Sequence, residues 1–197
     1  MKTKDGYVQG YNAQAVATED QIVVAAEVTE EHNDHAQLHP MIAATNQSLA
    51  DAGIDDRPEQ LLADAGYCSE DNLAGLSEQD PDCLIATRNT RRNPQPRNGR
   101  RGPLPAAATL VDKMDRKVSK KAGRAVYQKR QHIIEPVFGQ TKDARGARQF
   151  MRRGKAAAAS EWKLLMGTHN LLKLYRQTLT DPSATPWTPR AGAPATC

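Results

Sequence analysis

Asp64 stands where an acidic residue could do chemistry. It follows the short apolar run Gln60–Ala63, and Gly66 behind it lets the chain turn sharply. Such a run predicts a strand, and an aspartate at the carboxyl end of a strand in an α/β sheet lies where active sites are usually built. The alternative is an aspartate that only caps the following turn. The residues themselves leave both interpretations open.

Glu135 is the second candidate acid. It lies in the segment YQKRQHIIEPVFGQTK, which runs from Tyr127 to Lys142 and is otherwise basic and apolar. On a straight helix Lys142, two turns further on, would share a face with Glu135. Pro136 predicts a kink in this helix or a restart. The alternative is a surface glutamate in an ordinary ion pair.

The histidines and cysteines give only weak indications of a metal site or of disulfide bonds. Three histidines in and after the polar stretch EEHNDH could suggest zinc, but no cysteine lies near them and no HExxH motif occurs, so we expect a polar loop before a helix. The three cysteines show neither metal-site spacing nor a disulfide framework and are expected to be free thiols: Cys68, Cys83 and Cys197.

Apolar periodicity predicts the elements that must position these acids. Two strands form a hairpin around a polar turn, a helix ending before Gly53 follows, and the order strand, short helix, strand implies a parallel pairing. The chain then returns to helices, in which Trp162 is expected in the core rather than as a platform for bases. The predicted strands are 11–17, 22–28, 60–63 and 83–87, and the predicted helices are 36–52, 69–76, 110–131 and 156–179. The fold class is therefore α/β.

Composition limits the class of protein. Hydrophobic residues make up 39% of the 197 and charged residues 25%, which is typical of a soluble globular chain. The length fits one domain, residues 1–180, followed by a Pro-, Ala- and Thr-rich tail, 181–197, that we expect to be disordered. Neither a membrane-spanning run nor a signal peptide is apparent, so we expect a cytoplasmic protein without a membrane partner.

Charge is distributed unevenly along the chain. Residues 1–85 carry a net charge of −14 and residues 86–197 a net charge of +18. Such asymmetry indicates a polyanionic partner, although the two halves could instead pair with each other. The stretch 88–108, rich in Arg, Asn, Pro and Gly, is expected to be a flexible basic loop, either a solvated tether or a DNA clamp. Its candidate DNA-binding residues are Arg91, Arg92, Arg100 and Arg101.

Four ordered blocks resemble one known family. They are KTKDGYVQGYNAQ, LLADAGY with Asp64, YQKRQHIIEPVFGQTK with Glu135, and RRGKAAAASEWKLLMGTHNLLKL. Together they resemble the C-terminal part of the catalytic domain of a bacterial insertion-sequence transposase of the DDE superfamily. This resemblance implies a ribonuclease-H-like mixed sheet flanked by helices, in which three carboxylates hold two divalent ions, Mg²⁺ or Mn²⁺, for in-line phosphoryl transfer.

The resemblance also assigns roles to residues. Asp64 matches the second acid and Glu135 the third, so both are expected catalytic and metal-binding residues. Tyr127, Arg130 and Lys142 match residues associated with DNA handling, although one extra residue separates Arg130 from its glutamate. The first acid of the family lies on an opening strand upstream of the first block, and Asp5 is a poor substitute for it because it falls in an expected turn.

These expectations support two related hypotheses. The first is a transposase that cuts element ends and joins them to target DNA, in a copy that is truncated and inactive alone. The second is a remnant that binds DNA without catalysis. The expected partners are DNA, at the element ends and the target, and a second copy in a homo-oligomer.

Overall fold

A mixed sheet of five strands forms the centre of the protein. The computed structural model describes residues 2–3, 6–7, 10–88, 102–180 and 195–196, and the strand order is β4-β3-β7-β5-β6. Strands β3 (Asn12–Thr18) and β4 (Val23–Thr29) form the predicted antiparallel hairpin. Strands β5 (Gln60–Ala63) and β6 (Asp82–Ile85) pair in parallel, as predicted. The α/β class is confirmed, and the sheet is consistent with a ribonuclease-H-like fold.

The middle of the sheet holds a strand that we had not expected. Strand β7 (Ala195–Thr196) lies between β3 and β5, antiparallel to β3 and parallel to β5. Both of its residues are buried. These residues belong to the tail predicted to be disordered, and residues 181–194 and 197 lie outside the described part. A two-residue strand thus fills a central position beside the seven residues of β3.

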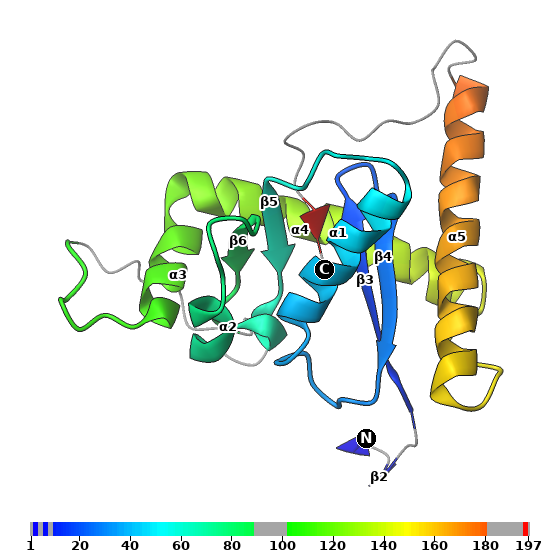
Figure 1. Ribbon diagram of the computed structural model, residues 1–197, viewed down its shortest axis with the longest axis horizontal. Helices are drawn as coiled ribbons and strands as arrows, with labels where there is room; N and C mark the ends of the chain where they lie inside the picture. Colours follow the sequence, from blue (N-terminus) through cyan, green and yellow to red (C-terminus); the bar gives the residue numbers. More distant parts are fainter. Residues whose placement is uncertain (1, 4–5, 8–9, 89–101, 181–194, 197) are drawn as a thin grey trace.

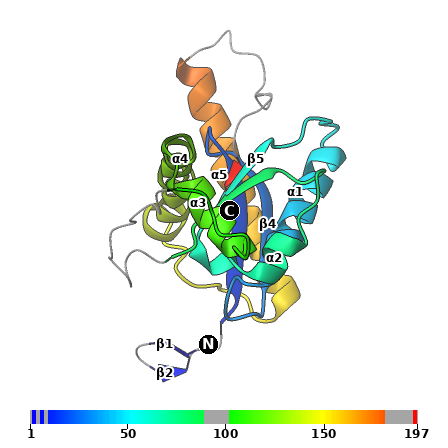
Figure 2. The ribbon, with the colours of Figure 1, turned by 90° about the vertical axis from the view of Figure 1, so that its left-hand side faces the viewer.

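Helices cover both faces of the sheet. Helix α1 (Leu38–Asp51) packs on one face and α4 (Lys121–Gly139) crosses the other (Figures 1 and 2). Helix α1 ends before Gly53, whose φ of 70° suits a residue without a Cβ. The core between these layers includes Leu38, Met41, Leu62, Ile85, Ile133 and Val137.

Short elements connect the acid-bearing strand to the helices. The 3₁₀ turn η1 (Ala65–Tyr67) follows β5, and α2 (Glu70–Ala74) has the predicted N-cap, Ser69. Near the N-terminus, β1 (Lys2–Thr3) pairs with β2 (Gly6–Tyr7) apart from the main sheet (Figure 2).

The helix predicted over residues 110–131 is in fact two helices. Helix α3 (Leu110–Ser119) ends at Lys120, whose extended ψ of 151° turns the chain into α4. At this corner a Cβ on Gly123 would lie 2.1 Å from the carbonyl oxygen of Lys117. The prediction was wrong because apolar periodicity continues through the corner, whereas the close backbone approach depends on one glycine.

Helix α4 continues through Pro136 without a restart and ends in a π turn, η2 (Gln140–Ala144). The proline has no N–H for the carbonyl of His132, four residues earlier. The side-chain amide of Gln21 donates to that carbonyl oxygen instead, at 2.8 Å. The π turn changes the number of residues per turn after Gly139. Lys142 therefore does not share a face with Glu135 in the way that a straight α-helix predicted.

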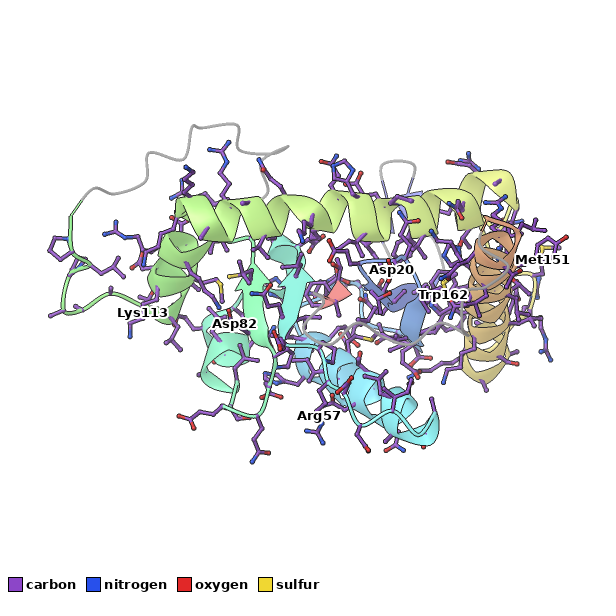
Figure 3. All side chains as sticks on the ribbon, turned by 90° about the horizontal axis from the view of Figure 1, so that it is seen from above. Asp20, Arg57, Asp82, Lys113, Met151 and Trp162 are labelled. Atoms are coloured by element: carbon purple, nitrogen blue, oxygen red, sulfur yellow. The ribbon has the colours of Figure 1, made fainter. Side chains whose placement is uncertain are left out.

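Helix α5 (Lys155–Thr180) packs along β4 at the edge of the sheet (Figure 1). Trp162 lies on the side of α5 that faces the sheet (Figure 3), and its side chain is 4% exposed. Its indole N–H donates to the carbonyl oxygen of Gln14 at 2.7 Å, and Phe138 stacks on its ring at 5.7 Å. The core position predicted for Trp162 is confirmed. Over the described residues, none of the helices is long and apolar enough to cross a membrane.

Candidate functional site

One edge of the sheet collects the polar side chains. Strand β3 runs opposite to β4, β5 and β6, so the start of β3 and the ends of the other three strands meet at the same edge. The carboxyl ends of parallel strands are the usual place for an active site in an α/β sheet. Asn12, Asp34 and Asp64 all lie at this edge, which we call the acid edge.

Asp64 immediately follows β5 and is half-buried. Its Oδ1 accepts a hydrogen bond of 2.7 Å from the backbone N–H of Gly66, so the carboxylate caps η1. The capping role considered for this residue is therefore present. This cap uses the Oδ1 atom of Asp64, and the Oδ2 atom stays available for chemistry.

A second carboxylate at this edge was not predicted. Asp34 lies in the loop after β4, and its Oδ1 accepts hydrogen bonds of 2.7 Å from the amides of both Asn12 and Gln14. A Cβ on Gly66 would lie 2.9 Å from Asp34 Oδ2 and 3.0 Å from Asp64 Oδ1. The two carboxylates thus flank Gly66. The only signal for Asp34 in the sequence is its place in the polar loop that follows β4, five residues after Thr29.

Hydrogen bonds connect the acid edge to the core. Gln14 donates to Asp34 and accepts at its side-chain oxygen from the hydroxyl of Tyr67, while its backbone carbonyl accepts from Trp162. Tyr67 is 5% exposed. Asp34 is therefore held in one orientation by a buried network, which is the kind of support that a functional carboxylate requires.

Glu135 lies on the exposed side of α4, the helix that packs against β3, β5 and β7. Its neighbours Ile133, Ile134 and Val137 point into the core and fix the rotation of the helix. None of the ion pairs formed within the described ranges involves Glu135, and its exposed position leaves the alternative of a surface ion-pairing residue open. Whether its carboxylate shares a cleft with Asp64 stays a prediction.

The residues predicted to handle DNA lie beside aromatic rings. The guanidinium of Arg130 lies 5.9 Å from the centre of the Tyr127 ring, and the ammonium of Lys142 lies 5.2 Å from the centre of the Phe138 ring. These pairs join the residues before and after Glu135 to aromatic rings on the same helix. The candidate DNA contacts Arg91, Arg92, Arg100 and Arg101, and also Asp5, lie outside the described residues.

Carboxylate oxygens are suitable ligands for Mg²⁺ or Mn²⁺. Within the described ranges, however, no three His, Cys, Asp or Glu side chains gather as a metal site would require.

A cavity of about 770 Å³ adjoins the acid edge. Its walls come from the start of β3, the end of α4 with η2, the loop 147–154, and α5. Asn12 belongs both to this lining and to the hydrogen bonds of Asp34. Among the described residues the lining contains four cations and no carboxylate: Lys142, Arg148, Arg152 and Arg153. Aromatic rings supply much of the rest, from Tyr11, Phe138, Phe150 and Trp162.

The sheet, its flanking helices and the acids at one edge define an α/β protein with a ribonuclease-H-like arrangement. Residues 82–175 match a family model described as "Transposase DDE domain". This match supports a transposase of the DDE superfamily, and the segment includes Glu135, Tyr127, Arg130 and Lys142, whereas Asp64 precedes it. No curated protein and no solved structure matches the chain significantly. Proteins of the DDE superfamily generally use divalent metal ions.

Proposed function

We propose that this chain forms part of the catalytic domain of an insertion-sequence transposase, which cuts DNA at element ends and joins the 3′-hydroxyl to target DNA. The observation that carries the proposal is the transposase match over residues 82–175, which contains Glu135 and its basic neighbours. Asp64 lies at the carboxyl edge of the sheet, and α4, which carries Glu135, packs against the strand that precedes Asp64.

In this proposal the residues position charge rather than form covalent intermediates. Asp64 and Glu135 would hold Mg²⁺ or Mn²⁺, and such an ion would supply activation of the attacking oxygen and stabilisation of the leaving oxygen. Tyr127, Arg130 and Lys142 hold the phosphates of the DNA strand on either side. Phosphoryl transfer depends mainly on such positioned charge, so an incomplete acid set leaves the reaction very slow.

We further propose that a third carboxylate enters on a strand in the place of β7. Strand β7 pairs only with Ala17 and Thr18 of β3, while the rest of β3 within the described ranges pairs with β4 alone. Thr196 pairs with Leu62 in parallel register. In a longer strand at this place, the residue two positions after the one that pairs with Leu62 would therefore lie beside Asp64.

The fit of β7 in this position is imperfect. Thr196 is fully buried, and its hydroxyl has no hydrogen-bond partner among the described atoms. A buried hydroxyl without a partner is unfavourable, so an apolar side chain would suit the position better. A longer strand with such a residue could displace β7 and complete the acid edge.

DNA binding is proposed for the basic second half, with the loop 88–101 and residues 113–153 contributing most. The alternative is a protein that binds DNA without catalysing its cleavage, because its set of catalytic acids is incomplete. Asp34, whose carboxylate lies close to Gly66 as that of Asp64 does, is a further candidate for the third acid.

The test is strand cleavage and joining on the element's own ends with Mg²⁺ or Mn²⁺. It compares the chain as given with a version extended at its N-terminus by a strand that carries an aspartate. We expect cleavage only from the extended version. Specific cleavage by the unextended chain that Asp64→Ala abolishes would overturn the need for an added acid, and Asp34→Asn and Asp5→Ala would then locate the third carboxylate.

A further inference from the structure

The cavity beside the acid edge combines two chemical features that the site residues above do not explain. In the part of the chain that the structure describes, four cations and no carboxylate line it, and four aromatic side chains contribute to the same walls. Cations recognise phosphates, and aromatic rings stack on bases, so this combination suits a nucleotide whose base is not paired.

The basic wall is built by the loop 147–154, and its conformation is held from both ends. The carboxylate of Glu161 accepts hydrogen bonds from the backbone N–H groups of Met151 and Arg152, at 2.9–3.1 Å. Gly154, at the end of the loop, adopts a φ of 89°, and Arg145 before it binds the α5 carbonyls of Leu165 and Thr168.

The acids near this wall are already engaged with partners. Asp143 forms an ion pair with Arg148, and Glu161 binds the loop backbone. The side chains of Arg152 and Arg153 are exposed and line the cavity. The wall therefore presents positive charge that its acidic neighbours do not fully neutralise.

The aromatic wall is formed by rings from three segments. The Phe150 ring meets those of Tyr11 and Trp162 edge-on, at centroid distances of 6.4 Å, and Phe138 stacks on Trp162. Tyr11, Phe138 and Phe150 are only partly buried, so each keeps some ring surface accessible. A flat aromatic ligand could contact this surface.

We propose that this cavity holds an unpaired nucleotide of a single DNA strand, with its base against the aromatic wall and its phosphates against Lys142, Arg152 and Arg153. The proposal rests on the proposed function, because Asn12 connects the cavity to Asp34 and thus to the acid edge. It adds a preference for single-stranded DNA next to the cleaved phosphate, a property that duplex binding by the basic half does not imply.

The test is binding of a fluorescently labelled oligothymidylate of about twelve nucleotides, compared with a duplex of equal length. The chain contains two tryptophans, so Trp187→Phe leaves Trp162 as the only one, and we expect the oligothymidylate to quench its fluorescence. The double substitution Arg152→Ala/Arg153→Ala should weaken oligothymidylate binding about tenfold. It should also reduce the slope of the logarithm of affinity against the logarithm of salt by the amount that about one phosphate contact or more contributes.

Two further variants serve as a control and as a test of stacking. Lys120→Ala/Lys121→Ala removes the same charge from exposed positions at the opposite end of α4, and should weaken oligothymidylate and duplex binding to a similar extent, by less than the roughly tenfold loss of oligothymidylate affinity expected for Arg152→Ala/Arg153→Ala. Phe150→Leu keeps apolar volume but removes the ring, and should weaken oligothymidylate binding by roughly fivefold or more while duplex affinity is retained. Circular dichroism establishes that each variant is folded.

The outcomes separate this inference from the proposed function. Salt-dependent duplex binding without Trp162 quenching, or equal effects of the two double substitutions on oligothymidylate, would overturn the cavity proposal and leave the proposed function standing. Absence of binding to either form of DNA would overturn both.

Discussion

The side-chain amide of Gln21 donates a hydrogen bond of 2.8 Å to the backbone carbonyl oxygen of His132, across 111 positions of sequence. This carbonyl lacks its usual helical donor because Pro136 has no N–H. Gln21, at a φ of 63° in the β3–β4 turn, thus ties the hairpin to α4, the helix that carries Glu135. The same residue accepts at its carbonyl oxygen from the ring of His169 on α5, at 2.9 Å.

Gln21→Ala should lower the free energy of unfolding by about 1 kcal/mol, because it leaves the His132 carbonyl without this partner. In a Pro136→Ala background the helix regains an N–H for that carbonyl, and the effect of Gln21→Ala should become smaller. Urea denaturation of the four proteins in this double-mutant cycle measures the coupling. Equal effects in both backgrounds would contradict the link between Gln21 and the proline.

Gly123→Ala should destabilise the α3–α4 corner by about 1–3 kcal/mol, because the added methyl would meet the carbonyl oxygen of Lys117. Gly139→Ala is the matched control, since it lies in the same helix and its added Cβ would meet nothing within 4 Å. That control should be neutral or stabilising. The thermal midpoints of both variants measure the difference, and similar midpoints would contradict the close approach.

His169 should make stability depend on pH below about 6.5, the usual pKa of histidine. Its side chain is fully buried, and burial lowers its pKa, as do the charges of Arg145 and Lys173, against the opposing hydrogen bond to Gln21. Because the folded pKa lies below the unfolded one, the unfolded state takes up the proton first. Stability is thus complete above the unfolded pKa and is lost as the pH falls through the folded value.

Urea denaturation at several pH values, with His169→Gln beside the parent chain, tests this expectation. The substitution should remove part of the decline in stability between about pH 6.5 and 5, where few carboxylates titrate. If parent and variant decline in parallel, His169 does not take up the proton.

DNA affinity should fall as salt rises, because each phosphate contact releases bound counterions. On duplex DNA the logarithm of affinity should change by about −0.9 per contact for each unit in the logarithm of salt. Replacing Arg91, Arg92, Arg100 and Arg101 with Ala should reduce both the affinity and this slope. Fluorescence anisotropy between about 50 and 200 mM salt measures them, and binding unaffected by salt or by these substitutions would exclude the electrostatic mechanism.

The elements predicted from sequence were those with strong local signals. The hairpin and the run before Asp64 alternate or cluster apolar residues, and Ser69 caps α2 as a serine at that position should. Trp162 was expected in the core with the leucines around it; the tryptophan is buried there, whereas Leu171 is 67% exposed. These features depend on neighbours within a few residues, so they can be predicted from the local sequence alone.

The features that were missed depend on contacts between distant segments. Strand β7 has only two residues and forms because β3 and β5 leave room for it. The corner at Lys120 depends on the close approach of Gly123 to Lys117. Asp34 joins Asp64 only because antiparallel pairing brings the end of β4 to the acid edge, which periodicity alone does not reveal.

In the proposed function, Asp64 and Glu135 serve one catalytic site for DNA cleavage. The most direct measurement is the rate of Mg²⁺-dependent cleavage of element ends by the N-terminally extended protein, with Asp64→Asn and Glu135→Gln tested separately and together. Each substitution should lower the rate at least about a hundredfold, the pair should cost little more than either alone, and DNA affinity should be retained. Cleavage that persists in either single variant would contradict the shared site.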